Sequence, residues 1–439
     1  MPSCRNLKKT NLASCLDLEG APPARGSTPV GIIQTCVQFV IGANVSLRSV
    51  PRLLGILYGD TLEPHSVVPE ASSVRWWLLR LGLYALREPL PQADDWAYII
   101  DHSVQIGTVK VCLILGIRLS DVPYPQRALR HEDMQVIDVI PVQTSTGEIV
   151  AAQLEKASLR TGIPRQIVSD GGSDVKKGAE LFAQAHPQTA VSYDAAHHGA
   201  IVLKRCFEND AKWKDYTSQL GQVKSRIQQT LDAFLMSPSL RPKARYMNLK
   251  SLLKWSRQIL KLLDRGSAGG RASERADARY GWLREYRESI ERWSRWEATV
   301  STSVAFVRTR GLSQGCESEL RLKLEQLPSD SYDEALANVL VKFVQESSNH
   351  ASTGESLVGS SEVLESVFGK WKTVEHQESK SGITSLVLSL GVLLGPWPAS
   401  RVKDALEATP VKHVVSWCQA FLPKSVQSQR QAAFADVKA

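Results

Sequence analysis

The chain has 439 residues, enough for two or three domains, and its 43% hydrophobic and 22% charged content is typical of a soluble globular protein. The formal net charge of +8 favours a polyanionic partner without identifying one, because many basic proteins bind nothing charged. The seven cysteines lack zinc-ligand spacing and no apolar run reaches about 18 residues without interruption, which argues against a zinc finger, a disulfide framework and a membrane span.

The N-terminal part is predicted to be helical after a polar start. Residues 1–28 are rich in small and polar side chains, and we expect them to be loosely ordered. Residues 29–94 predict two short helices, a turn and a third helix that carries Arg75 and Arg80. This arrangement resembles a helix-turn-helix module, in which the two arginines would contact DNA. The alternative is an ordinary three-helix bundle with solvated arginines.

Residues 95–205 predict three strands, a helix, a strand, a helix, a strand and a helix. Short turns favour an antiparallel meander for the first strands, and crossover helices favour parallel addition of the later ones. This is the element order of the ribonuclease H-like fold, so the expected class is α/β with a mixed sheet. We expect residues 206–355, which are helical, basic and rich in tryptophan, to be an all-α insertion, and residues 356–439 to complete the core.

Two aspartates are predicted at or near the ends of apolar strands. Asp101 lies in WAYIIDHSV, and Asp170 ends RQIVSD before two glycines. A carboxylate inside an apolar strand is costly to bury, and a divalent cation would offset that cost. Ligands also bind at the carboxyl ends of strands in open α/β sheets. The alternatives are an exposed position on an edge strand for Asp101 and an ordinary turn for Asp170.

A third carboxylate is expected from the helix in SSEVLESVFGKWK. Glu365, Phe368 and Lys372 share one helical face, so the phenyl ring would fix the glutamate and the lysine would meet a phosphate. Glu362 lies one turn earlier and remains an alternative ligand. Two strand carboxylates and one helix carboxylate are enough to hold two metal ions for phosphoryl transfer. The alternative is an amphipathic helix with solvated charges.

Two further pairs are candidates for the site. Asp194 and His197 follow the fifth predicted strand, and both could face the site across the first turn of the next helix, although a lone histidine is more often structural. Trp293 and Trp296 are spaced i, i+3 in the insertion. They are candidates to stack on a displaced base, whereas the usual interpretation of such a pair is helix core.

The chain resembles a DDE-type transposase, of the kind found in bacterial insertion sequences, in WAYIIDHSVQIGT, RQIVSDGGSDVKKG, SYDAAHHGAIVLK and SEVLESVFGKWK. The E-x-x-F-x-x-x-K pattern is similar to the signature helix of cut-and-paste bacterial transposases. The D-x-x-H pattern that begins at Asp194 is similar to the C-x-x-H of hAT-type transposases, with aspartate in place of cysteine. The resemblance implies a ribonuclease H-like catalytic core with the triad Asp101, Asp170 and Glu365.

The resemblance also implies cofactors and partners. The triad would hold two Mg²⁺ ions, with Mn²⁺ as a substitute, and His197 would assist catalysis. The expected partner is double-stranded DNA, as terminal inverted repeats and as target, bound by a homodimer or larger assembly in the cytoplasm at the nucleoid. Phosphate contacts are expected from Lys176, Lys177, Lys370 and Lys372. The competing hypotheses are another ribonuclease H-like nuclease and a non-catalytic DNA-binding protein descended from a transposase.

Overall fold

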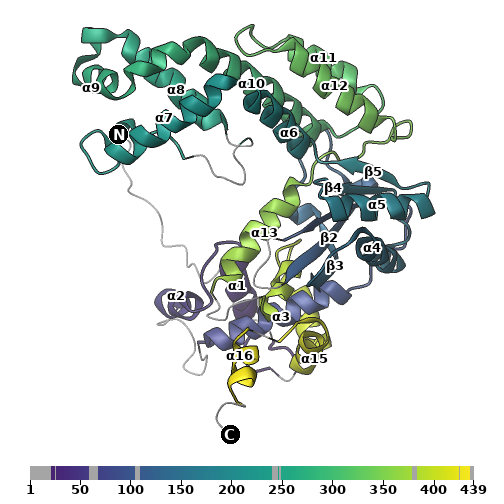
Figure 1. Cartoon of the computed structure of the whole chain (residues 1–439). Helices are drawn as coiled ribbons and strands as arrows, with labels where there is room; N and C mark the ends of the chain where they lie inside the picture. Colours follow the sequence, from purple (N-terminus) through teal and green to yellow (C-terminus); the bar gives the residue numbers. More distant parts are fainter. Residues whose placement is uncertain are drawn as a thin grey trace, which may run out of the picture. The chain divides into compact units, whose positions relative to one another are not determined.

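The computed structural model of the chain describes most of its length (Figure 1). Of the N-terminal segment expected to be loosely ordered, residues 1–20 and 25 lie outside the described residues. The described residues are 21–24, 26–58, 68–103, 109–239, 246, 249–377, 383–424 and 426–435.

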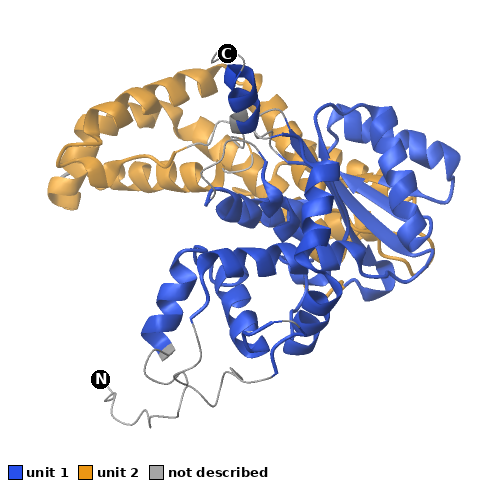
Figure 2. Cartoon of the chain, turned by 90° about the horizontal axis from the view of Figure 1, so that it is seen from below, with its two compact units in different colours: residues 1–122, 129–191, 361–439 blue, residues 123–128, 192–360 orange. Residues whose placement is uncertain are grey.

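The chain divides into two compact units (Figure 2). The first, here called the sheet unit, comprises residues 1–122, 129–191 and 361–439. The second, here called the helical unit, comprises residues 123–128 and 192–360. The helical insertion expected over 206–355 therefore begins earlier, and each unit is described by itself below.

The sheet has the strand order β3-β2-β1-β4-β5. β1 pairs antiparallel with β2 and parallel with β4, while β2 pairs antiparallel with β3. An antiparallel meander followed by strands added through crossover helices is the ribonuclease H-like arrangement, which confirms the predicted fold class. The strands are β1 (Trp96–His102), β2 (Lys110–Arg118), β3 (Gln135–Val142), β4 (Gln166–Ser169) and β5 (Ala190–Tyr193).

Helices α4 (Gly147–Thr161) and α5 (Ser173–Ala185) cover one face of the sheet. Their apolar side chains pack in one cluster with Trp96, Tyr98 and Ile100 of β1. Because side chains alternate along a strand, the odd-numbered residues of β1 point to the opposite face. There β1 is contacted by α13 (Glu362–Glu375), the helix that carries the candidate glutamates (Figure 1).

The N-terminal helices belong to the sheet unit rather than to a domain of their own. They are α1 (Val30–Ile41), α2 (Ser49–Tyr58) and α3 (Ala71–Arg87), at the predicted positions. Helix α3 contacts α1, β3, the 3-10 helix η8 (Ser385–Gly391) and the C-terminal helices α14 (Ala399–Ala408) and α15 (Val411–Phe421). The chain ends in α16 (Val426–Ala435).

The burial of α3 corrects its interpretation as a recognition helix. Only Ser72 and Arg87 of α3 are exposed, whereas a recognition helix must present an open face to the major groove. Gly82 shows how closely the helix is enclosed, because a Cβ atom added there would lie 1.9 Å from the carbonyl oxygen of Leu388. The helices predicted from the pattern are present, but α3 is a central packing element of the sheet unit.

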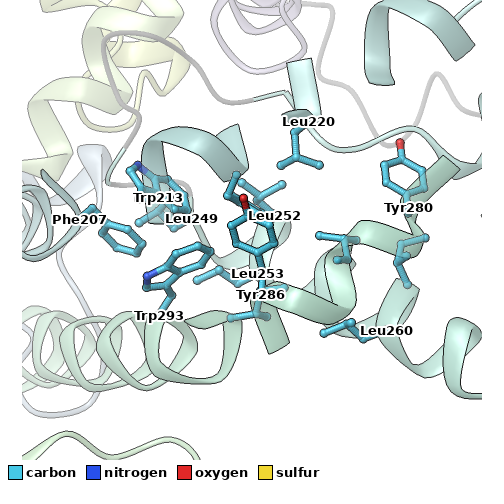
Figure 3. Close-up of a cluster of buried hydrophobic side chains, with 14 of the residues drawn as sticks. Phe207, Trp213, Leu220, Leu249, Leu252, Leu253, Leu260, Tyr280, Tyr286 and Trp293 are labelled. Carbon is cyan, nitrogen blue, oxygen red and sulfur yellow. The ribbon is translucent and has the colours of Figure 1, made fainter. Parts of the chain in front are cut away.

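The helical unit is built on one aromatic and aliphatic core (Figure 3). α6 belongs to it because Val202, Leu203 and Phe207 pack in this core, which moves the end of the sheet-containing part from residue 205 to 191. In the residues that the structure describes, no helix is both long and apolar enough to cross a bilayer. The α-helices are α6 (Ala195–Glu208), α7 (Ala211–Ile227), α8 (Leu249–Asp264), α9 (Gly270–Tyr280), α10 (Arg287–Arg310), α11 (Cys316–Glu325) and α12 (Glu334–Ser348).

Candidate active site

Asp101 lies near the carboxyl end of the central strand β1, between β2 and β4. This placement excludes the alternative of an edge strand. The parallel register pairs Ile100 with Ser169, so the next residues along the two strands, Asp101 and Asp170, are neighbours. Adjacent strands are about 4.8 Å apart, which brings the two aspartates together at the edge where α/β sheets bind ligands.

Asp170 is held by a turn that the two following glycines allow. Its Oδ1 accepts a hydrogen bond of 2.8 Å from the N–H of Gly172. Gly171 has a φ of 85°, in the left-handed region where glycine is favoured. Asp170 can therefore be both a turn residue and a site residue, because the turn fixes one of its carboxylate oxygens beside the end of β1.

Glu365 lies in the first turn of α13, and its side chain is exposed. The helix is anchored by Leu364, Val367 and Phe368, which are buried. The charge of Glu365 contributes to raising the pKa of Asp101. This interaction supports Glu365 as the third carboxylate, and Glu362 stays an alternative.

The surroundings of Asp101 strongly disfavour its charge. Burial is the largest cause that raises the pKa of Asp101, to about 7, and the charges of Asp170, Glu365 and Asp174 add to it. The main-chain N–H of His102 opposes the rise by donating a hydrogen bond of 2.6 Å to Asp101 Oδ1. A carboxylate that stays protonated near neutral pH beside other carboxylates is typical of a functional site.

The donor chemistry of this group fits a hard divalent cation, since carboxylate oxygens are the ligands that Mg²⁺ and Mn²⁺ prefer. A bound cation would offset both the burial of Asp101 and the repulsion from its acidic neighbours. Within the described ranges, however, no group of three or more His, Cys, Asp or Glu side chains is gathered closely enough to hold a metal ion. The carboxylates are thus neighbours that do not form a closed ligand set.

The sequence did not lead us to predict a role for His102 or for Asp174. The His102 side chain is 8% exposed, and its Nδ1 lies 3.6 Å from Asp174 Oδ2. Burial lowers the pKa of His102, and the charge of Asp174 opposes this effect. Alternation along β1 contains the signal, because it directs His102 to the face covered by α5, where Asp174 begins the helix.

The lysines predicted to contact phosphates lie in the sheet unit and most have partners. Lys177 Nζ is 2.5 Å from Glu148 Oε1, and Lys176 Nζ is 3.9 Å from Glu180 Oε1. Such exposed ion pairs are weak and screened by salt, so a phosphate can replace the carboxylate.

The two lysines of α13 differ. Lys370 Nζ lies 2.6 Å from Nε2 of His131, a residue of the 3-10 helix η3 (His131–Asp133). This contact connects α13 to the segment that precedes β3. Lys372 is half-buried on α13. Lys370 therefore has a structural contact, and phosphate binding by both residues stays a prediction.

The two arginines of α3 bind protein groups rather than facing outward. Arg80 donates to the main-chain carbonyls of Leu406 and Thr409, where α14 ends. Arg75 donates a hydrogen bond of 2.7 Å to Ser385 Oγ. The assignment of these residues to DNA recognition is corrected, because the guanidinium groups connect α3 to the C-terminal part of the sheet unit.

Asp194 and His197 are described within the helical unit. Asp194 is 3% exposed and caps α6, with its Oδ1 accepting a hydrogen bond of 2.8 Å from the N–H of His197. The D-x-x-H spacing thus has a local structural cause, since the N-cap side chain normally bonds the N–H three residues later. A catalytic role for the imidazole of His197 stays a prediction.

The tryptophan pair belongs to the core of the helical unit, in which Figure 3 labels Trp293. Trp293 is 0% exposed, and its Nε1 donates a hydrogen bond of 2.8 Å to Asp210 Oδ2. Trp296 lies at the margin of the same core, and its Nε1 donates to Asp333 Oδ2 at 3.1 Å. A fully buried ring cannot stack on a base, so base stacking by Trp293 is corrected in favour of helix core.

Comparison with known proteins finds a likeness among solved structures but none in sequence. No family model matches the chain, and no curated protein matches it. Among solved structures, it is similar to the Drosophila P element transposase strand transfer complex, with 11% identity and a TM-score of 0.41, over 93% of this chain and 100% of that chain. At this TM-score the likeness carries no argument, so the functional case depends on the site itself.

Proposed function

We propose that this chain is a DDE transposase, which cleaves DNA at element ends and joins them to a target. The observation that carries the proposal is the pairing of Asp101 with Asp170 at the carboxyl ends of adjacent parallel strands, with Glu365 close enough to raise the Asp101 pKa. Acidic groups on a ribonuclease H-like sheet are suited to phosphoryl transfer, because that chemistry needs metal ions held by carboxylates.

The roles of the residues follow from their positions. Asp101, Asp170 and Glu365 would hold two Mg²⁺ or Mn²⁺ ions, which when bound supply an activated nucleophile and stabilise the leaving oxygen of the phosphodiester. Asp101 must lose its proton to act as a ligand, so metal affinity should rise with pH up to about 7, the pKa of the metal-free carboxyl. The turn fixes one carboxylate oxygen of Asp170, and the buried face of α13 anchors the helix that carries Glu365.

We further propose a kind of transposable element and the DNA on which the protein acts. The E-x-x-F-x-x-x-K pattern of α13 favours a bacterial insertion-sequence enzyme that acts at the nucleoid on terminal inverted repeats. Two element ends must be joined, which favours a homodimer or larger assembly on DNA. His197 would stabilise charge that develops on the scissile phosphate.

The test uses the full chain, labelled duplex DNA from the flanks of its gene, and Mg²⁺. Strand cleavage near the gene boundary is expected, and Asp101→Asn, Asp170→Asn and Glu365→Gln should each abolish it while DNA binding persists. Glu362→Gln is the matched control and should cleave normally. Loss of cleavage in Glu362→Gln with normal cleavage in Glu365→Gln would overturn the triad. Cleavage of an RNA–DNA hybrid but not of duplex DNA would indicate another class of nuclease.

A further inference from the structure

Helix α8 of the helical unit carries a row of positive charge on one face. Lys250, Lys254, Arg257 and Lys261 are spaced by four, three and four residues, which places them on one side of the helix. The opposite side is the core face and includes Leu252, Leu253, Ile259 and Leu260. At 1.5 Å per residue, the row is roughly 16 Å long.

The row borders a groove between α8 and α10 within the helical unit. The groove has a volume of about 420 Å³, and α10 contributes Ser294, Glu297 and Ala298 to its wall. Lys250, Lys254 and Lys261 are exposed. In the part of the chain that the structure describes, no ion pair engages Lys254 or Lys261.

The residues that line the groove include four basic side chains and one acidic side chain, Glu297. Glu297 is half-buried, and burial raises its pKa while Lys250 and Arg257 oppose the rise. Arg257 also donates a long hydrogen bond of 3.4 Å to the carbonyl oxygen of Asp330. The sequence from 211 to 265 contains twelve Lys or Arg and three Asp or Glu residues, so the excess charge extends beyond the groove.

The arrangement is unfavourable for the free protein. Like charges four residues apart destabilise a helix, and the core contacts on the other side of α8 would be as good with neutral residues at these positions. A row of regularly spaced cations beside a groove suits a linear polyanion. The groove wall contains no aromatic side chain, so it lacks the stacking surface by which single strands are bound.

We propose that the α8–α10 groove binds the sugar-phosphate backbone of duplex DNA, without reading its sequence. This inference rests on the proposed function, because it names a surface that holds the DNA on which the acidic site acts. The row matches the axial length of about five base pairs at 3.4 Å each. Contacts of this kind position the duplex and carry no sequence information directly.

The test compares two triple variants of the full chain. Lys250→Gln, Lys254→Gln and Lys261→Gln remove the row, and Lys204→Gln, Lys323→Gln and Lys342→Gln remove the same charge from α6, α11 and α12. Affinity for a short labelled duplex of arbitrary sequence is measured against salt concentration. The first variant should reduce the steepness of log affinity against log salt by about 2.7, for three phosphate contacts at about 0.9 each. The control should leave it nearly unchanged.

A single variant that removes a negative charge, and should therefore increase affinity for DNA, completes the test. Glu297→Gln removes the acid from the groove and should strengthen duplex binding several-fold, a gain that misfolding cannot imitate. Equal salt dependence for the two triple variants, or no gain for Glu297→Gln, would overturn the groove assignment. If the wild-type chain still cleaves DNA, the proposed function survives that result. Binding of single strands in preference to duplex would also overturn the assignment, and failure of the wild type to bind any duplex would overturn both proposals.

Discussion

The raised pKa of Asp101 predicts that the proposed active site destabilises the protein when metal is absent. The pKa of this carboxyl is about 7 in the folded chain, against an ordinary value of 3.8 for an aspartate in water. Between those values the native state binds more protons than the unfolded state, so the free energy of unfolding falls as pH rises. Asp101→Asn removes the titration and keeps an oxygen that can accept the His102 N–H.

The magnitude follows from the two pKa values. The stability gained by Asp101→Asn should grow from about 2 kcal/mol at pH 5 to about 4 kcal/mol at pH 8, at 1.36 kcal/mol per pKa unit. Urea unfolding of both proteins at several pH values, without divalent metal, measures the gain. Asp138→Asn is the matched control, because Asp138 is also a buried strand aspartate but lies 3.4 Å from Lys156 Nζ. It should lower stability.

Metal should narrow the difference in stability between the two proteins. A ligand that binds only the native state stabilises it by about 2.7 kcal/mol at a hundredfold excess over its Kd. Mg²⁺ or Mn²⁺ should therefore stabilise the wild type and have little effect on Asp101→Asn. The reasoning fails if the asparagine variant is no more stable than the wild type at pH 8, or if its advantage does not grow with pH.

Three other changes test separate parts of the structure. Gly82→Ala should lower stability by about 3 kcal/mol, because the new methyl group overlaps the carbonyl of Leu388; a normal melting temperature would refute this packing. Arg80→Ala should cost about 1–3 kcal/mol through lost hydrogen bonds and leave the salt dependence of DNA binding unchanged, whereas a shallower dependence would restore its role in DNA recognition. His197→Ala should slow cleavage by roughly 10²–10³-fold with the fold preserved. Asp194→Ala, its control, should cost about 1 kcal/mol of stability as a lost cap; a His197 variant with lower stability and an unchanged rate would contradict catalysis.

The fold could be predicted because its signals are local. Apolar runs predicted the strands, and helical periodicity predicted the helices that the structure shows as α4 and α5. The order of these elements then determined the sheet, since short turns give antiparallel pairs and crossover helices give parallel ones. Asp101 and Asp170 follow from the same information, because both lie at ends of strands that the order makes adjacent.

The role of α3 could not be predicted because three of its packing partners, η8, α14 and α15, lie some 300 residues later in the sequence. Arg75 bonds a residue 310 positions away, and Arg80 bonds residues 326 and 329 positions away. An arginine on an amphipathic helix has the same local pattern whether it meets a phosphate or a distant carbonyl. Trp293 presented the same ambiguity, and long-range packing determined that it belongs to the core.

The assignment of the third carboxylate depends on both the local sequence pattern and long-range packing. Periodicity alone leaves Glu362 and Glu365 equivalent, because both lie in the first turn of α13. Glu365 is supported because its charge contributes to raising the pKa of Asp101, which points to the face of β1 opposite to His102. Two consecutive residues of β1 therefore point to opposite faces of the sheet. On one face the charge of Glu365 acts on Asp101, and on the other face His102 lies close to Asp174 at the start of α5. The strand β1 thus positions both Asp101 and His102. A shift of one residue in its register would therefore disrupt both contacts together.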